Sequence, residues 1–339
     1  MWWKRAAAIA SAAAILAGAG CREVPGPKSA ARPPQLSKRL YASDLLPADL
    51  DVVVRVDMAR LRAGLGPSFA ETLAARAGEA GGEPFVAEAI AGADAVWIGL
   101  RLADIDAGDR VLVAEGRLGE IHLEPSEWKE TTPAATMEEV RILDRQGSVP
   151  RSGTGRIVVY AKKLYAFVSP VEVDATSRLL RDGPDAGRGD PRADGLVSAD
   201  VRGHRLPRSL EKKYPSIAGI IGGITRVRGS ATLADDGVRV SIEMIAKSPE
   251  AATRAEKFLT AIRDSGASTK FAALLATVKL SRIDKTLSLA ATIPAAMVVS
   301  ALGGASAPDP APAPSNTPPG SSATPSPTPP PRTFSPVHP

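Results

Sequence analysis

The chain has 339 residues, of which 44% are hydrophobic, 4% aromatic and 23% charged, with 42 basic and 37 acidic side chains. That length predicts about two domains. After the N-terminus the chain contains no run of ~20 apolar residues, so no membrane-spanning helix is predicted there. One Cys and three His argue against a disulfide framework and against Cys- or His-rich metal sites, so we expect no metal and no other cofactor. The interspersed charges and few aromatics predict no nucleic-acid partner.

Residues 1–20 have the pattern of an export signal peptide. A short cationic head ends in Lys4-Arg5, and Ala6–Gly20 is a 15-residue apolar run of mostly Ala, Ile and Leu. Fifteen helical residues rise only about 22 Å, which is short of the ~30 Å hydrocarbon core of a bilayer. The sequence therefore predicts export, with a membrane-spanning helix as the weaker interpretation.

The only cysteine, Cys21, follows this apolar run directly. The segment Leu16-Ala17-Gly18-Ala19-Gly20-Cys21 resembles the lipobox of bacterial lipoproteins, although Gly18 stands where a branched apolar residue is usual. The resemblance implies a lipidated Cys21 that anchors the chain to a membrane. Arg22 follows it, and by the lipoprotein sorting rule of diderm bacteria this implies the outer membrane or its periplasmic face. The alternative is cleavage after Ala19, which would give a secreted soluble protein.

Two segments flank the core with compositions that do not favour folding. Residues 21–43 carry the lipidated Cys and a Pro-containing stretch that is typical of a flexible tether. Residues 303–339 contain 13 Pro among Ala, Ser, Thr and Gly, a composition typical of a disordered tail rich in polyproline II.

Residues 44–183 are expected to form the first half of an α+β core. A strand over 47–57 ends in Asp57, and hairpins are indicated where alternating apolar residues flank a polar turn. Val96, Ile98, Leu100 and Leu102 share one face of the first hairpin, and we expect them to face the helices. The other expected elements are helices over 58–65, 67–77 and 84–91, hairpin strands over 96–102 and 110–116, a second hairpin over 156–160 and 164–168, and a helix from Pro170 to 181.

Residues 184–302 repeat that order of elements. The expected elements are a strand over 194–200, a helix over 207–222, hairpin strands over 227–233 and 238–244, a second hairpin over 277–282 and 286–291, and a helix from Pro294 to 302. The fold class predicted is therefore α+β, with two related halves, each made of antiparallel hairpins with helices on one face. The two sheets could join into one.

The Pro47–Asp57 opening, the hairpin-rich duplicated body and the lipobox-like leader resemble uncharacterised exported lipoproteins of high-GC diderm bacteria. That resemblance implies no catalytic residue, so none is assigned. We expect a non-enzymatic envelope lipoprotein with a structural, assembly or binding role, for which a protein or peptidoglycan partner is conceivable. The alternative is an envelope hydrolase with an unrecognised site.

Several polar clusters are candidates for sites, and in each a structural role is the favoured interpretation. Asp57 and Asp200 could be paired carboxylates, but Asp57 is well placed to cap the following helix. The three carboxylates of Asp104–Asp109 resemble the start of a calcium loop, yet Glu115 is the only later ligand candidate, so a solvated acidic turn is favoured. Asp182, Asp185 and Asp190 are expected to be solvated as well.

Other short motifs carry still less information about chemistry. Ser209 and Lys212 match Ser-x-x-Lys without the companion motifs of acylating enzymes, and Arg188-Gly189-Asp190 is a three-residue match to an adhesion motif. His122 and Glu124 lie on one side of an expected surface strand without a third ligand. The apolar segments 216–222 and 295–299 could line a lipid-sized groove, but buried core helices have the same pattern.

Overall fold

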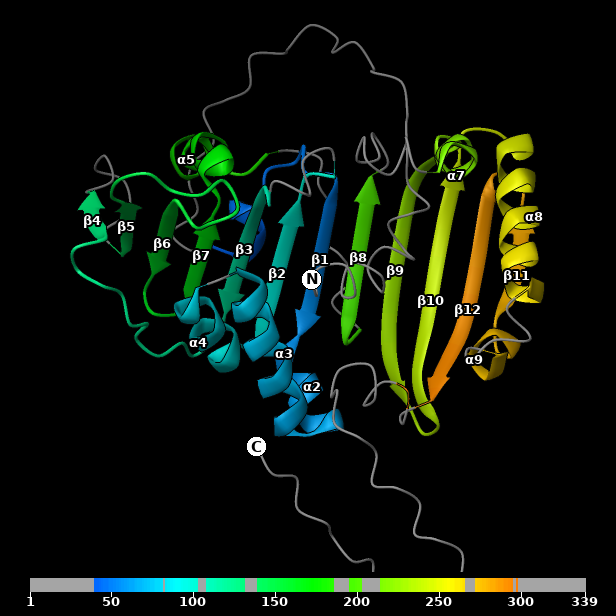
Figure 1. The fold of residues 1–339 in the computed structure, drawn as a ribbon, viewed down its shortest axis with the longest axis horizontal. Coiled ribbons are helices and arrows are strands. Elements are labelled where there is room, and N and C mark those ends of the chain that lie inside the picture. The colour runs from blue at the N-terminus through cyan, green and yellow to red at the C-terminus, as the bar shows by residue number, and fades with distance from the viewer. Residues whose placement is uncertain are drawn as a thin grey trace, which may run out of the picture. The chain divides into compact units, whose positions relative to one another are not determined.

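The computed structural model describes residues 40–81, 83–102, 108–131, 139–185, 195–202, 214–265, 272–294 and 297. All the described residues belong to one compact unit, which ends at Gly304, and residues 305–339 lie outside the described residues. Twelve strands of this unit form a single sheet in the order β11-β12-β10-β9-β8-β1-β2-β3-β7-β6-β5-β4 (Figure 1). Neighbouring strands are antiparallel throughout.

The N-terminal half of the sheet carries helices before and after its hairpins. Its elements are η1 (Ala42–Leu45), β1 (Val52–Asp57), α2 (Met58–Leu65), α3 (Pro67–Gly81), α4 (Pro84–Gly92), β2 (Ala95–Leu100), β3 (Arg110–Glu115), β4 (Trp128–Thr131), β5 (Val140–Arg145), β6 (Arg156–Tyr160), β7 (Leu164–Val168), η3 (Pro170–Glu172) and α5 (Val173–Asp182).

The C-terminal half has longer strands. Its elements are β8 (Val197–Arg202), α7 (Pro215–Ile221), β9 (Ile224–Ala234), β10 (Gly237–Ala246), α8 (Pro249–Ser265), α9 (Ala272–Ala276), β11 (Lys279–Ile283) and β12 (Thr286–Pro294). The two halves join where β1 pairs with β8, with Val52 opposite Val201 and Val56 opposite Val197.

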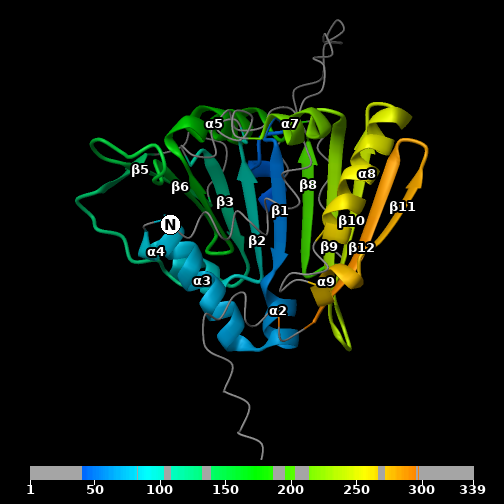
Figure 2. The same cartoon turned by 45° about the vertical axis from the view of Figure 1, so that its right-hand side comes forward.

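One face of the sheet packs against α2, α3 and α4 in the first half and against α8 in the second. Val96 and Leu112 lie in one buried cluster with Phe85 of α4, and Met244 lies in another with Ala252 of α8. Because side chains alternate along a strand, β1 and β2 contribute every second residue to this face. Figure 2 shows α3 and α8 on the same side of the sheet.

The opposite face of the first half is also buried, which corrects the expectation of helices on one face only. Trp97 and Val113 pack there with Leu45 of η1 and Leu180, which belongs to α5. The reason is visible in β6 and β7, whose residues are apolar on both faces, since a strand buried on both sides needs two covers. In the second half the same face carries polar side chains, among them Ser198, Asp200, Arg226, Arg239 and Glu243.

The expected hairpins are present with small shifts at their ends. Ala95–Leu100 pairs with Arg110–Glu115, and residues 227–244 lie in the hairpin formed by β9 and β10. Val96 and Leu102 are buried, and Ile98 and Leu100 are partly buried in the clusters on the helix face. The prediction for these four side chains is confirmed.

Other expectations about elements were wrong or incomplete. Pro294 ends β12, opposite Gly237, and of the helix expected over 294–302 only Met297, which is helical, lies among the described residues after it. His122 and Glu124 lie in an irregular segment and not in a strand. Strands β4 and β5, helices α8 and α9 and the short η1 were not expected. Within the described part of the chain, no helix has the length and apolar character needed to cross a membrane.

Candidate functional site

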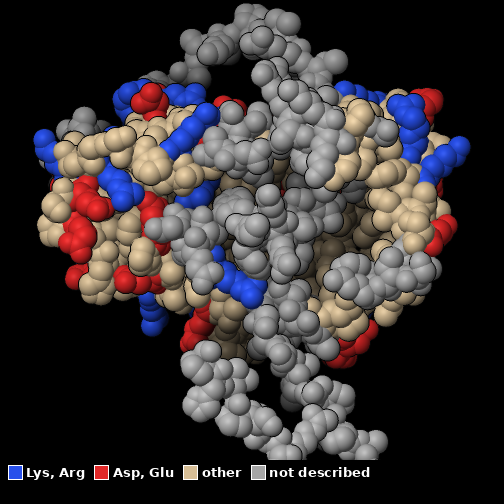
Figure 3. All heavy atoms as spheres, viewed as in Figure 1, with Lys and Arg blue, Asp and Glu red and all other residues tan. Residues whose placement is uncertain are grey.

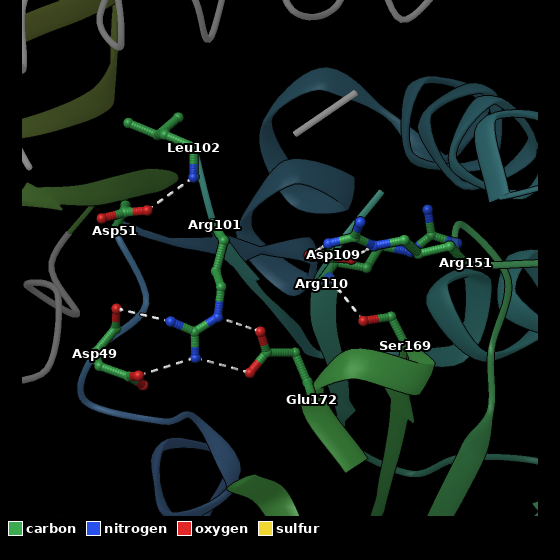
Figure 4. A network of polar contacts seen from close by, with 9 residues as sticks. All are labelled: Asp49, Asp51, Arg101, Leu102, Asp109, Arg110, Arg151, Ser169 and Glu172. Atoms are coloured by element: carbon green, nitrogen blue, oxygen red, sulfur yellow. Dashed lines mark hydrogen bonds and ion pairs between the residues drawn. The ribbon is translucent and has the colours of Figure 1, made fainter. Parts of the chain in front are cut away.

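A network of polar side chains, several of them buried, lies at the edge of the sheet where β1 begins, β2 ends and β3 begins (Figure 4). Asp49 and Asp51 precede β1, Arg101 follows β2, and Glu172 lies in η3 just after β7. The sequence folds this way because the β2–β3 hairpin and the β7–η3 turn end at the same edge of the antiparallel sheet. The network therefore joins segments that lie far apart in the chain.

Arg101 is the centre of this network. Its Nε and Nη2 donate to the two carboxylate oxygens of Glu172, the second at 3.1 Å, and its Nη2 lies 3.0 Å from Oδ2 of Asp49. Glu172 has no solvent exposure. The hydrogen bonds that Arg101 donates to Glu172 raise the pKa of the Arg101 guanidinium above its ordinary value, while burial opposes that shift. The pair acts as an ionic brace between β2 and η3.

Asp51 and Ser169 fix the backbone around this brace. Oδ2 of the buried Asp51 accepts a hydrogen bond from the Leu102 amide at 2.8 Å, and the Asp51 carbonyl accepts one from the Arg202 amide at 2.7 Å. The amide of Arg110 donates to Oγ of Ser169 at 3.0 Å, and the Ser169 amide donates back to the Arg110 carbonyl at 3.0 Å. These bonds fix the backbone next to Arg101, just after β2, and at Arg110, where β3 begins.

Asp109 is buried and paired, which corrects the expectation of a solvated acidic turn at this residue. It is 1% exposed, and Nε and Nη2 of Arg151 donate to its two oxygens at 3.1 and 2.8 Å. Asp104 and Asp106, the other two carboxylates of that turn, lie outside the described residues. Glu115 ends β3, as its alternating pattern predicted.

Asp57 and Asp200 have separate structural roles. Oδ1 of Asp57 accepts a hydrogen bond from the Arg60 amide at 2.9 Å, so the expected helix cap is confirmed. Asp200 does not end its strand, since β8 continues to Arg202, and it pairs with Arg226 at 2.6 and 3.1 Å. Asp200 lies opposite Val53, four residues from Asp57, or about 13 Å along the strand. The two carboxylates therefore cannot share one reacting group.

The remaining sequence candidates give no site in the described part of the chain. His122 is 91% exposed in its side chain and lies 3.2 Å from Oε2 of Glu88. Asp185 accepts a hydrogen bond from the Ala48 amide at 3.2 Å, and Asp182 pairs with Arg181. No cluster of three metal-ligating side chains occurs among the described residues. Candidates that lie outside them are Cys21, Arg188–Asp190, Ser209, Lys212 and most of 295–299.

Arg101, Arg110, Ser169 and Glu172 were not predicted from the sequence. One local signal was present, because Ser169-Pro170-Val171-Glu172 has the Ser-x-x-Glu spacing of a helix capping box. That signal would have placed the Glu172 carboxylate on the Ser169 amide. In the structure that amide donates to Arg110 and the carboxylate binds Arg101, 71 residues away.

No family model and no curated protein matches the sequence. Solved structures similar to the chain include three crystal forms of TP0453. Crystal form III has 10% identity and a TM-score of 0.48 and covers 79% of this chain and 100% of that one. Crystal form I has 10% identity and a TM-score of 0.47, with 78% and 98% covered. Crystal form IV has 11% identity and a TM-score of 0.43, with 76% and 94% covered.

Chemically, the described network holds the fold together. Glu172, Asp109, Asp200 and Glu83 are each bound by at least one guanidinium group. On the face drawn in Figure 3, basic and acidic side chains are interspersed over the described surface.

Proposed function

We propose that the chain is a lipid-anchored protein of the bacterial cell envelope that acts by binding or scaffolding and has no catalytic role. The leader supports the anchor, because a cationic head and a 15-residue apolar run end at the only cysteine, Cys21. In this proposal residues 1–20 are removed, Cys21 carries the lipid, and the sheet is held at the outer membrane or its periplasmic face. A second acyl chain would make the anchoring stable.

The observation that carries the non-enzymatic part of the proposal is the saturation of the buried carboxylates. Both carboxylate oxygens of Glu172 already accept hydrogen bonds from Arg101. Asp200 and Asp109 are held in the same way by Arg226 and Arg151. These groups brace a rigid twelve-stranded sheet, which suits a protein that presents surfaces to a partner.

The anchor is tested on protein purified from a membrane fraction of a diderm bacterium. Mass spectrometry of the mature chain should show an N-terminus at Cys21 with the added mass of acyl chains. A Cys21→Ser variant should move to the soluble or inner-membrane fraction as an unprocessed chain. A mature N-terminus at Gly20, or an intact Met1, would overturn the proposal.

The hydrolase alternative makes the opposite prediction for Asp57 and Asp200. If these carboxylates only cap a helix and pair with Arg, Asp57→Ala and Asp200→Ala lower the melting temperature. If one of them were catalytic, its Asn variant would keep the wild-type melting temperature and lose hydrolysis of fluorogenic ester or peptide substrates. Wild-type protein that hydrolyses such substrates, with loss in either Asn variant, would favour the alternative.

We also propose that the two halves are related by duplication. The neighbour order β1-β2-β3-β7-β6 has the same chain order as β8-β9-β10-β12-β11, and the central pairing is symmetric about Val54 and Ala199. The connections differ, since β4 and β5 stand where the second half has α8 and α9. In an experimental structure, the two five-strand sets should superpose by a two-fold axis between Val54 and Ala199. A rotation axis elsewhere would contradict duplication.

A further inference from the structure

Arg110 is a buried cation for which the described residues offer no direct partner. It is 8% exposed, at the first position of β3. Within the described part of the chain its guanidinium makes no hydrogen bond and no ion pair, although its backbone is fully bonded to Ser169. Burying a charge without a partner is costly, so buried cations in folded proteins are normally paired.

Two acidic groups near Arg110, Glu83 and the neighbouring residue Asp109, are already bound by other side chains. Glu83, at the start of α4, accepts hydrogen bonds from Arg145 at 2.7 Å and from the Thr154 amide at 3.0 Å. Asp109 is held on both oxygens by Arg151. Burial lowers the pKa of the Arg110 guanidinium from its ordinary value. The negative charge of Glu83 raises that pKa, but by less than burial lowers it.

The guanidinium of Arg110 nevertheless remains within reach of solvent. The fully buried side-chain atoms that lack a partner include Arg55 Nη1, Trp97 Nε1 and Thr176 Oγ1, and no nitrogen of Arg110 belongs to that group. A ligand could therefore reach Arg110 but not those atoms. The reciprocal bonds with Ser169 hold the backbone of Arg110 in place at the sheet edge, so that little backbone entropy would be lost on binding.

We propose that Arg110 anchors a small oxyanion, a carboxylate or a phosphate group, at the edge of the sheet beside η3. The guanidinium offers up to five N–H donors in a planar fork that matches two oxygens of such a group. Binding supplies the negative charge that the buried cation lacks, and no covalent step is involved. The inference concerns a ligand site on the sheet and is independent of the lipid anchor.

The test uses the full chain without its leader and measures melting temperature and binding heat at constant ionic strength. Inorganic phosphate, sulfate and acetate are titrated against chloride. At a hundred times its dissociation constant, an anion that binds the native state should raise the melting temperature by about 5 °C. Phosphate acting alone identifies a phosphate site, and acetate acting equally well identifies a carboxylate site.

Three variants make the test specific. R110M should abolish the shift, and R110K, which keeps the charge but lacks the fork, should weaken binding at least tenfold. R239M removes an exposed Arg of β10 and should respond like the wild type. Equal shifts in the wild type and R110M would overturn the proposal by showing a general salt effect.

A second readout needs no ligand. In chloride alone, R110M should melt at or above the wild-type temperature, because an apolar side chain of similar length replaces an unpaired buried charge. A drop of more than about 5 °C, with R110K unchanged, would mean that Arg110 has an internal partner in solution and would overturn the proposal. Neither result bears on the lipidation of Cys21, so the two proposals fail separately.

Discussion

At the residue scale, the fold depends on guanidinium groups that bind carboxylates from distant parts of the chain. Arg101 and Glu172 are 71 residues apart, and Arg145 and Glu83 are 62 apart. Sequence reasoning predicted the Asp57 cap because a cap and its amide lie three residues apart. It could not predict the long-range pairs, because nothing in local spacing indicates which of 29 Arg side chains meets a given carboxylate.

Replacing Arg101 with Met should destabilise the protein by about 3–5 kcal/mol, because Glu172 would remain buried without its partner. Urea unfolding followed by circular dichroism measures this change. R181M is the matched control, since Arg181 pairs with its exposed neighbour Asp182 and its loss should change little.

The double variant R101M/E172M tests whether the stability lost in R101M comes from the unpaired carboxylate of Glu172. Removing both charges should recover much of the loss, because no buried carboxylate is then left unpaired. An R101M protein as stable as the wild type would show that Glu172 does not depend on Arg101.

Asp144 makes the stability of the fold decrease as the pH is lowered into the acidic range. Burial alone would raise the pKa of this carboxyl, but hydrogen bonds from Arg156 at 2.6 Å and Thr131 at 2.7 Å lower it below its ordinary value of 3.8. Because the folded-state pKa is the lower one, the stabilisation is present above about pH 4 and is lost as the pH falls through the folded value.

The stability difference between wild type and Asp144→Asn should therefore be large at pH 6 and shrink below pH 4. Chemical unfolding at a series of pH values measures this difference. Asp236→Asn, in the exposed turn between β9 and β10, controls for the loss of one negative charge. A difference that stays constant from pH 6 to pH 3 would contradict the assignment.

At the element scale, the hairpins could be predicted because alternation and turn residues are local signals. Strands β6 and β7 match their expected bounds, Arg156–Tyr160 and Leu164–Val168. Helix α8, which was not predicted, has a local signal too, since Ala251, Ala252 and Ala255 lie on one helical face after Pro249. β4 spans only 4 residues, too few for its alternation to be distinctive.

Gly116 sets the end of the β3 strand. Its φ of +148° is one that L side chains rarely adopt, and a Cβ there would lie 2.6 Å from the Asp94 amide nitrogen. Gly116→Ala should therefore lower the free energy of unfolding by at least about 1–3 kcal/mol, because the strained backbone remains and the clash is added.

Gly219 provides the opposite case in the same protein. It is exposed in the interior of α7, and a Cβ there would meet nothing within 4 Å. Gly219→Ala should leave stability unchanged or raise it by up to about 1 kcal/mol, because Ala favours the helix more than Gly. Thermal melts of Gly116→Ala and Gly219→Ala measure the two changes in stability. Equal changes in melting temperature would contradict the assigned role of Gly116.

At the scale of the whole molecule, the pairing of β1 with β8 joins the strands of the two halves into one sheet. The Asp57 amide donates to the Leu196 carbonyl at 2.8 Å, and the Arg202 amide donates to the Asp51 carbonyl at 2.7 Å. Leu196 and Val238 from the second half also share a buried cluster with Met58 from the first. The sequence left open whether the two sheets join, because strand pairing between halves depends on register and leaves no local pattern.

We therefore expect the two halves to unfold in one cooperative transition. Outside the leader the only Trp residues are Trp97 and Trp128, both in the first half, so fluorescence follows that half while circular dichroism follows both. The two urea curves should coincide for the wild type. Val56→Pro, which removes an amide from the ladder between β1 and its neighbours, should shift both curves together. A fluorescence transition that separates from the circular dichroism transition in the wild type would show that each half is stable by itself.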